Sequence, residues 1–267
     1  MKEVESTLII SSEEPQAIVE DIAALTSIAS YQLLPQGSLA IHDYHVDTPD
    51  RTLHYAGLSL RVREIDARPY LTLKGPPRRI GPGVVERLEI EAPWSEEALS
   101  RVAKELAHRN IRLLLTMPAL DSADPLDVMV GLGLQTIQHR ENYRQIRNLV
   151  MTDAGERPVL AELAIDSVIY HLAPQKVHHY EIEVEAKAEG GLPALEAVTE
   201  SLAEAYPETL LRWDHGKLST GRAIQELLNR GALTELVSAS GNLRPAAYEK
   251  IHGLLEGQNP HPNLPLL

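Results

Sequence analysis

The sequence of 267 residues contains no cysteine and no phenylalanine, and aromatic residues make up only 4% of it. Without cysteine, the chain can form no disulfide framework, no cysteine-ligated zinc or iron–sulfur site and no thiol nucleophile. Without phenylalanine, the core must be built from leucine, isoleucine, valine and alanine. Because hydrophobic residues make up 43% and charged residues 24% of the chain, we expect an ordinary globular protein with an aliphatic core.

Positive charge is also scarce, since 25 lysines and arginines face 38 acidic residues and the formal net charge is −13. Affinity for the nucleic-acid backbone comes largely from cationic side chains, so DNA or RNA is disfavoured as a partner. No apolar run approaches the roughly 18 residues that a membrane span needs. The opening MKEVESTLII lacks the pattern of a signal peptide. We therefore expect a cytoplasmic protein with neither a nucleic-acid nor a membrane partner.

Hydrophobic periodicity predicts an α+β fold rich in antiparallel strands. Alternation with a period of two predicts strands over residues 3–8, 41–47, 58–64, 70–74, 84–92, 138–150, 159–170 and 178–187. Helical spacing predicts helices over residues 95–109, 126–130 and 192–205, with further helices in 223–256. Residues 11–14 are typical of a capping box, before an apolar helical stripe of Ile18, Ile22, Leu25 and Ile28. Residues 153–155 predict a hairpin turn, and 260–267 a poorly ordered tail.

The polar faces of the predicted strands are sorted by charge. Glu181, Glu183 and Glu185 form one row, and neighbours of this kind lie roughly 7 Å apart. Such carboxylates repel one another unless they are solvated, paired with cations or bound to metal. A solvated edge explains any one strand, but six strands sorted in this way favour faces that converge inside a barrel. There the acids would hold a hard cation such as Mg²⁺ or Mn²⁺, and the bases a polyanion.

Nine ordered segments carry a resemblance to a known family. They include Glu3-Val4-Glu5, Asp47-Thr48-Pro49, Leu60-Arg61-Val62-Arg63, Leu73-Lys74-Gly75, Arg87-Leu88-Glu89-Ile90-Glu91, Arg140 with Tyr143, Ala161-Glu162-Leu163 with Asp166, Tyr180-Glu181-Ile182-Glu183, and Gly216-Lys217. In these segments, from Glu3 to about Gly221, the chain resembles the CYTH domain of the triphosphate tunnel metalloenzymes. That family includes class IV adenylate cyclases, thiamine triphosphatases and tripolyphosphatases.

The resemblance implies a closed antiparallel β-barrel tunnel of about eight strands with flanking helices over residues 1–222, and a C-terminal helical extension and tail over 223–267. The implied metal ligands are Glu3, Glu5, Asp166, Glu181 and Glu183. The implied substrate-binding residues are Arg61, Arg63, Lys74, Arg87, Arg140, Arg144 and Lys217. Glu3, Glu5, Arg61, Lys74 and Lys217 would carry catalysis, supported by Glu89, Glu91, Glu162 and Glu185.

The function that the resemblance implies is hydrolysis of a triphosphate-bearing substrate with Mg²⁺ or Mn²⁺, with inorganic tripolyphosphate as the first choice. Thiamine triphosphatase or class IV adenylate cyclase activity is an alternative. Thr7 and Gln138 replace two family lysines, which favours a second alternative, a non-catalytic module that binds polyphosphate. A carrier for an apolar ligand is a third. The C-terminal helices are candidates for capping the tunnel or for a homodimer contact.

We do not expect the histidines near these segments to bind metal. Asp43, His45 and Asp47 share one strand face, and we expect His45 to replace a packing aromatic residue there rather than to bind metal. His178 and His179 precede the glutamate row, and we expect them in a solvated turn.

Overall fold

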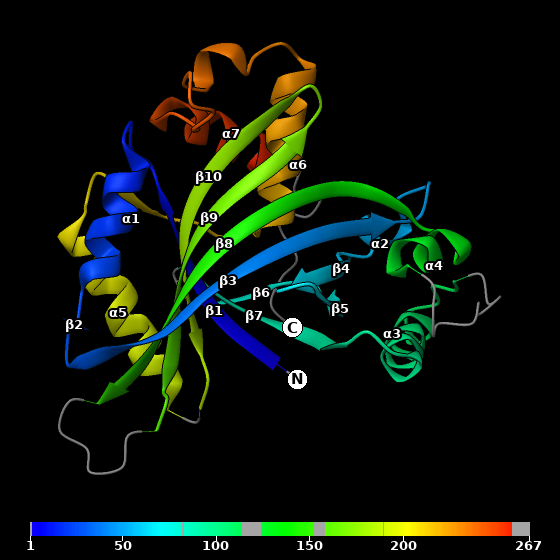
Figure 1. Ribbon diagram of the computed structural model, residues 1–267, viewed down its shortest axis with the longest axis horizontal. Helices are drawn as coiled ribbons and strands as arrows, with labels where there is room; N and C mark the ends of the chain where they lie inside the picture. Colours follow the sequence, from blue (N-terminus) through cyan, green and yellow to red (C-terminus); the bar gives the residue numbers. More distant parts are fainter. Residues whose placement is uncertain (1, 82, 114–123, 152–157, 189, 258–267) are drawn as a thin grey trace.

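A computed structural model of the chain describes residues 2–81, 83–113, 124–151, 158–188 and 190–257 (Figure 1). The predicted hairpin turn at 153–155 and the predicted tail at 260–267 lie outside the described residues. The predicted strands and helices otherwise recur, most with boundaries that differ by a few residues, and the fold is α+β as expected. The strand predicted over 41–47 begins ten residues earlier, at Tyr31.

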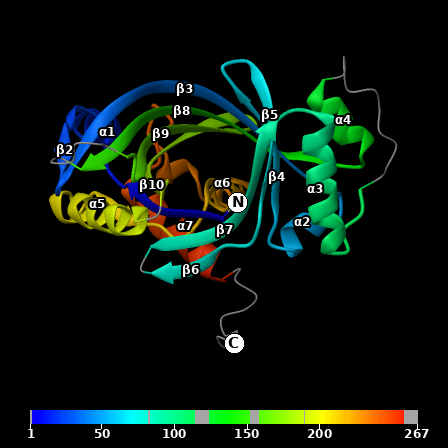
Figure 2. The ribbon, with the colours of Figure 1, turned by 90° about the horizontal axis from the view of Figure 1, so that it is seen from below.

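Eight antiparallel strands close into a ring of hydrogen bonds, which can be followed in Figure 2. The ring runs through β1 (Lys2–Ile10), β10 (Gln175–Ala186), β9 (Ala161–Leu172), β8 (Gln135–Met151), β3 (Tyr31–Asp47), β4 (Ser59–Ile65), β5 (Arg68–Lys74) and β7 (Val84–Pro93). It closes because β1 pairs with β10 through residues 5–9 and with β7 through residues 2–6, where Glu3 lies opposite Arg87. The predicted barrel tunnel is therefore confirmed.

Short strands extend the margins of the ring. They are β2 (Ser27–Ile28) on β3, β6 (Arg78–Gly81) on β7 and β11 (Leu210–Arg212) on β1. No strand was predicted where β6 lies. The two longest strands, β3 and β8, pair along almost their whole length and bulge at Pro35/Gly37 and His45/Val46.

Apolar side chains pack mainly on the outside of the ring, beneath helices. One cluster joins β1, β9 and β10 to α1 (Pro15–Ala24) and α5 (Gly191–Ala205). A second joins β4 and β5 to α2 (Thr52–Tyr55), α3 (Glu96–His108) and α4 (Pro125–Gly131). Because each strand buries one face in this way, its alternate side chains are left to face the interior.

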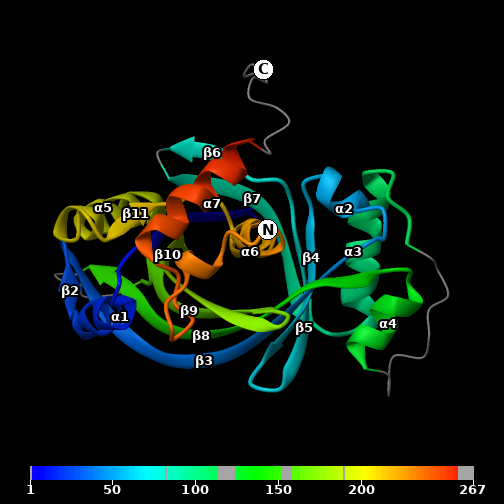
Figure 3. The same ribbon diagram turned by 90° about the horizontal axis from the view of Figure 1, so that it is seen from above.

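A third apolar cluster lies at one end of the ring. There Val168, Tyr170 and Val177 contact α6 (Lys217–Asn229), η1 (Thr234–Leu236) and α7 (Pro245–Gly257), which lie beside β9 and β10 in Figures 1 and 3. Helix α6 continues across residue 222, and the division into domains at that residue stays a prediction, as does a homodimer. Within the described ranges, no helix is both long and apolar enough to cross a membrane.

The first helix differs from its prediction at both ends. It begins at Pro15 with Glu14 in the N-cap position and no capping side chain, whereas Ser12 Oγ only accepts a hydrogen bond from Glu14 N at 3.1 Å. Proline is favoured in the first turn because its fixed φ suits a helix and it has no N–H to satisfy. The helix ends at Ala24, so the predicted stripe was wrong at Ile28, which lies in β2.

Candidate active site

The interior of the ring holds a cavity of about 550 Å³ lined mainly by charged side chains. They come from all strands of the ring and from the start of α6. Among the predicted site residues, the lining includes Glu3, Arg61, Arg63, Lys74, Arg87, Glu89, Glu91, Arg140, Arg144, Glu162, Glu183, Glu185 and Lys217. Glu5, Asp166 and Glu181 are not part of the lining but lie buried directly behind it. This charged lining gives no support to a carrier for an apolar ligand.

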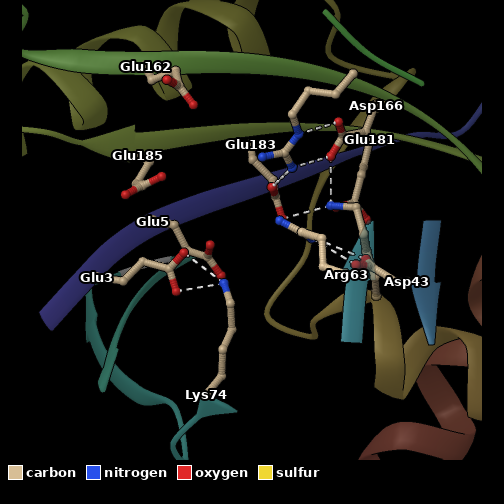
Figure 4. A network of polar contacts seen from close by, with 12 residues as sticks. Glu3, Glu5, Asp43, Arg63, Lys74, Glu162, Asp166, Glu181, Glu183 and Glu185 are labelled. Atoms are coloured by element: carbon tan, nitrogen blue, oxygen red, sulfur yellow. Dashed lines mark hydrogen bonds and ion pairs between the residues drawn. The ribbon is translucent and has the colours of Figure 1, made fainter. Parts of the chain in front are cut away.

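Asp166, Glu181 and Glu183 form a carboxylate cluster whose ligand oxygens lie within 4.8 Å of one another. The β9–β10 register places Glu181 opposite Asp166, and Glu183 follows on the same face. Lys217 Nζ lies 2.8 Å from an oxygen of Asp166 and 2.8 Å from one of Glu183, and it also contacts Glu181. Figure 4 shows the three acids close to one another. Three acids from two strands thus share one lysine.

Arg144 is the second cation of this carboxylate cluster. Its Nε and Nη2 donate to the two oxygens of Asp166 at 2.8 and 2.6 Å, and Nη2 also donates to Glu183. Burial alone would raise the pKa of Asp166 and Glu183, but the Arg144 and Lys217 charges outweigh it and hold both pKa values below their ordinary range. Asp166 and Glu183 are therefore ionised at neutral pH.

Glu3 and Glu5 on β1 form a separate acidic pair. Glu3 accepts from Lys74 Nζ at 2.8 Å and from Arg87 Nε at 2.9 Å, and Glu5 accepts from Arg87 Nη2. Burial raises the pKa of both groups, yet the charges of Lys74 and Arg87 bring that of Glu3 down to about 2. At Glu5 burial prevails over the Arg87 charge and raises the pKa to about 7. The predicted metal ligands therefore fall into two groups, a cluster of three and a pair.

The pKa values of Glu5 and Glu3 shift in opposite directions. Replacing either residue with glutamine should therefore change the pH dependence of stability in opposite ways. The raised pKa means that folded Glu5 binds its proton more tightly than the unfolded chain does, so stability falls as pH rises from about 4.5 to 7. Glu5→Gln should remove this loss, on the order of 3 kcal/mol, and be more stable than the wild type at pH 8. Urea unfolding in EDTA at a series of pH values measures the free energy of unfolding of both proteins.

Glu3→Gln is the matched control with the opposite sign. Because the pKa of Glu3 is lowered to about 2, its ionisation contributes stability that is complete above pH 4.5 and lost as pH falls toward 2. Glu3→Gln should therefore be less stable than the wild type at pH 8. If Glu5→Gln kept the wild-type decline between pH 4.5 and 7, burial would not control the proton of Glu5.

Asp43 on β3 holds three arginines and is a site residue that the sequence analysis missed. Its oxygens accept from Arg63 Nε at 2.8 Å, Arg140 Nη2 at 2.7 Å and Arg61 Nη1 at 3.3 Å. The side chain is 1% exposed. Burial would raise its pKa, but the three guanidinium charges hold it well below its usual range. The signal was the shared face of Asp43, His45 and Asp47, whose cross-strand partners include Arg63 and Arg140.

Several polar atoms around these arginines are buried without a hydrogen-bond partner in the described part of the chain. They are Arg61 Nε, Arg140 Nη1, His45 Nε2 and Gln138 Oε1. Burial and the neighbouring Arg63 lower the pKa of Arg61 to about 10. Unsatisfied donors beside crowded positive charge are what an anion would satisfy.

Residues from α6 and α2 extend this end of the cavity and were also missed. Arg222 lies 3.7 Å from Asp47 and contacts His54, and both Arg222 and His54 line the cavity. Lys187, which contacts Glu185 and Glu162, lines another part. Nothing local in the sequence identifies Arg222, because its place depends on how α6 enters the ring.

The predicted solvated turn at His178 and His179 is wrong, since both lie in β10 and His179 is fully buried. Its Nδ1 lies 3.0 Å from the Tyr248 hydroxyl and its Nε2 lies 2.8 Å from Glu181 Oε2. His179 continues the inward face of the glutamate row, and α7 covers it. It therefore positions Glu181 from behind.

Comparison with known proteins agrees with this architecture. The sequence model of the CYTH domain matches residues 1–210. One similar solved structure is a Hippeastrum protein described as a candidate adenylyl cyclase with a dominant triphosphatase activity. Its sequence is 16% identical to this one and its TM-score is 0.53, and the match covers 83% of this chain and 95% of the Hippeastrum chain. A candidate adenylate cyclase from Bacillus halodurans is 16% identical with a TM-score of 0.44, over 81% and 96%.

The search among curated proteins found no match. At 16% identity the Hippeastrum structure shows a shared fold. The family match spans more than half of the sequence and ends within β11, so it includes every strand of the ring. The chain therefore belongs to the CYTH family of triphosphate tunnel proteins.

Proposed function

We propose that this protein hydrolyses a triphosphate-bearing compound with the help of Mg²⁺ or Mn²⁺, and that inorganic tripolyphosphate is its best substrate. The observation that carries the proposal is a cavity inside the ring that is lined both by Glu183 of the carboxylate cluster and by several buried guanidinium groups. Acids suit a hard cation and guanidinium groups suit phosphate oxygens, and a metal-dependent triphosphatase needs both.

The donor set fits Mg²⁺ or Mn²⁺, because the carboxylate cluster offers only oxygen ligands and such ions bind oxygen. Asp166, Glu181 and Glu183 would hold the ion, and Glu3 and Glu5 are the second candidate group. When bound, such an ion neutralises phosphate charge and makes water a better nucleophile. Lys217 and Arg144 hold the carboxylates of the cluster together through ion pairs.

The arginines held by Asp43 are suited to bind and orient the phosphate chain. Asp43 fixes Arg61, Arg63 and Arg140 before any substrate arrives, so little side-chain entropy remains to be lost on binding. Among the described residues, Arg61 Nε and Arg140 Nη1 have no hydrogen-bond partner, and phosphate oxygens can accept from them. Fixed donors of this kind stabilise the charge that develops during phosphoryl transfer.

A non-catalytic polyphosphate-binding module is the second candidate. Thr7 and Gln138 are both buried at 7% exposure, and each stands where the family pattern has a lysine. Gln138 donates to Leu218 O at 3.3 Å, so its amide is bound to α6. Loss of two cations would weaken charge stabilisation during the reaction while leaving the other phosphate-binding groups in place.

Phosphate release measured with malachite green over a panel of triphosphates separates the candidates. With Mg²⁺ or Mn²⁺ we expect turnover of tripolyphosphate above that of thiamine triphosphate or ATP, and none above background in Glu3→Ala/Glu5→Ala. Formation of cyclic AMP and pyrophosphate from ATP would instead identify a cyclase. Micromolar tripolyphosphate binding by calorimetry without hydrolysis, together with activity in Thr7→Lys, would establish the binding module.

A further inference from the structure

Two histidines and a glutamate converge outside the barrel cavity, at the C-terminal helix. His215 lies between β11 and α6, while His252 and Glu256 are one turn apart on α7. The ligand atoms of the three side chains lie within 4.8 Å of one another. His215 Nε2 is 3.6 Å from Glu256 Oε1, and His252 Nε2 is 3.9 Å from the same oxygen. Helix α7 also lies beyond residue 210, where the family match ends.

We propose that His215, His252 and Glu256 bind a transition-metal cation of the zinc class and thereby tie α7 to the loop that leads into α6. Two imidazoles and a carboxylate are a typical donor set for Zn²⁺ with a fourth position left for water. Mg²⁺ and Mn²⁺ prefer oxygen ligands, so this site differs in metal preference from the carboxylate cluster of the cavity.

The distances suit a tetrahedral ion after a small movement. Bonds of about 2.0–2.1 Å to a tetrahedral centre separate neighbouring ligand atoms by about 3.4 Å. The two separations from Glu256 are 3.6 and 3.9 Å, and the two histidine nitrogens lie within 4.8 Å of each other, so the exposed side chains need to move inward by roughly an ångström to reach this geometry. His252 and Glu256 are 55% and 54% exposed, so both can close on an ion without disturbing the core.

The surroundings of His215 provide a second, independent observation. Its Nε2 is buried and makes no hydrogen bond within the described part of the chain. An imidazole nitrogen that is buried and unpartnered, and that points at another imidazole and a carboxylate, is a ready metal ligand. Trp213 packs edge-on against the His215 ring at 5.4 Å and lies 5.8 Å from the His252 ring, and it is itself fixed by a 2.9 Å bond to Thr220.

The site lies close to the cavity in the sequence, because His215 is two residues before Lys217. An ion held by His215 and α7 would anchor the start of α6, and with it the lysine that binds the carboxylate cluster. The proposal does not depend on triphosphate hydrolysis.

Zinc binding to the full chain, stripped of metal by a chelator, tests the proposal. Calorimetry should show that His252→Ala/Glu256→Ala binds one zinc ion fewer per chain than the wild type. At a zinc concentration about 100 times Kd, the melting temperature of the wild type should rise by on the order of 5 °C. Co²⁺ should give the intense visible absorption of a tetrahedral site with nitrogen ligands, and the double variant should lose it.

Two controls separate this site from other metal-binding groups. Glu105→Ala/His108→Ala removes a glutamate and a histidine from α3 and should keep the full zinc response. The Mn²⁺ response of the cavity should survive in His252→Ala/Glu256→Ala. A zinc response retained by that double variant, or no zinc response in the wild type, would overturn the proposal.

Discussion

Replacing Lys217 with methionine should reduce triphosphate turnover by about 10²- to 10³-fold, the usual cost of losing one fixed charge donor. Lys217 is the only residue described in contact with all three members of the carboxylate cluster, and it also lines the cavity. Its loss would remove a candidate phosphate ligand and leave Arg144 as the cluster's sole described ion-pair partner with a permanent charge. Steady-state phosphate release with Mn²⁺ measures the effect.

The same variant should show an unusual response to divalent cations. Removing one partner of a buried ion pair costs about 3–5 kcal/mol because it leaves uncompensated charge. Asp166 and Glu181 are 0% and 1% exposed, so Lys217→Met should be destabilised by about that amount in EDTA. Mn²⁺ supplies the missing positive charge, so it should raise the stability of the variant more than that of the wild type.

Lys187→Met is the matched control. Lys187 also contacts two glutamates of the lining, Glu185 and Glu162, but it is 33% exposed. We expect this variant to keep near-normal stability and an ordinary Mn²⁺ response. If Lys217→Met were as stable as Lys187→Met in EDTA, the carboxylate cluster would not require its lysine.

Replacing Asp43 with alanine should destabilise the protein by about 3–5 kcal/mol, since three buried guanidinium groups would lose their common partner. Arg140 is 2% exposed and has no other ion pair among the described contacts. Urea unfolding measures the loss. Tripolyphosphate should stabilise Asp43→Ala more than the wild type, because a polyanion can replace the carboxylate.

Glu86→Ala provides the comparison for Asp43→Ala. Glu86 also binds more than one cation, Lys2 and Arg78, but these are 72% and 69% exposed. Exposed ion pairs contribute little, so the midpoint of unfolding should hardly move. Equal effects in the two variants would mean that the buried arginines do not depend on Asp43.

The barrel and the charged interior could be predicted from the sequence because each strand carries its own signal. A period of two shows which side chains share a face, and rows such as Glu181, Glu183 and Glu185 show that one face is charged. The closure of the ring was not visible in this way. The pairing of β1 with β7 joins residues 78 to 86 positions apart, and only the family resemblance implied it.

Residues whose role depends on contacts between distant segments were missed. Asp43 stands in its own strand between His42 and Tyr44, while its arginine partners come from β4 and β8. His179 appears to continue into a polar turn, and its burial is explained by α7, about 70 residues later. Arg222 enters the cavity on a helix whose sequence gives no sign of the ring around it.

The placement of apolar packing on the outer surface of the strands has a consequence for redesign. The clusters beneath α1, α3 and α5 stabilise the barrel through side chains that, apart from Leu58, do not line the cavity. Exchanging lining residues in charge-balanced sets should therefore alter which anion is accepted while sparing most of the folding free energy. This scaffold is suited to engineering new polyanion specificities by such paired exchanges, with the helical layer left untouched.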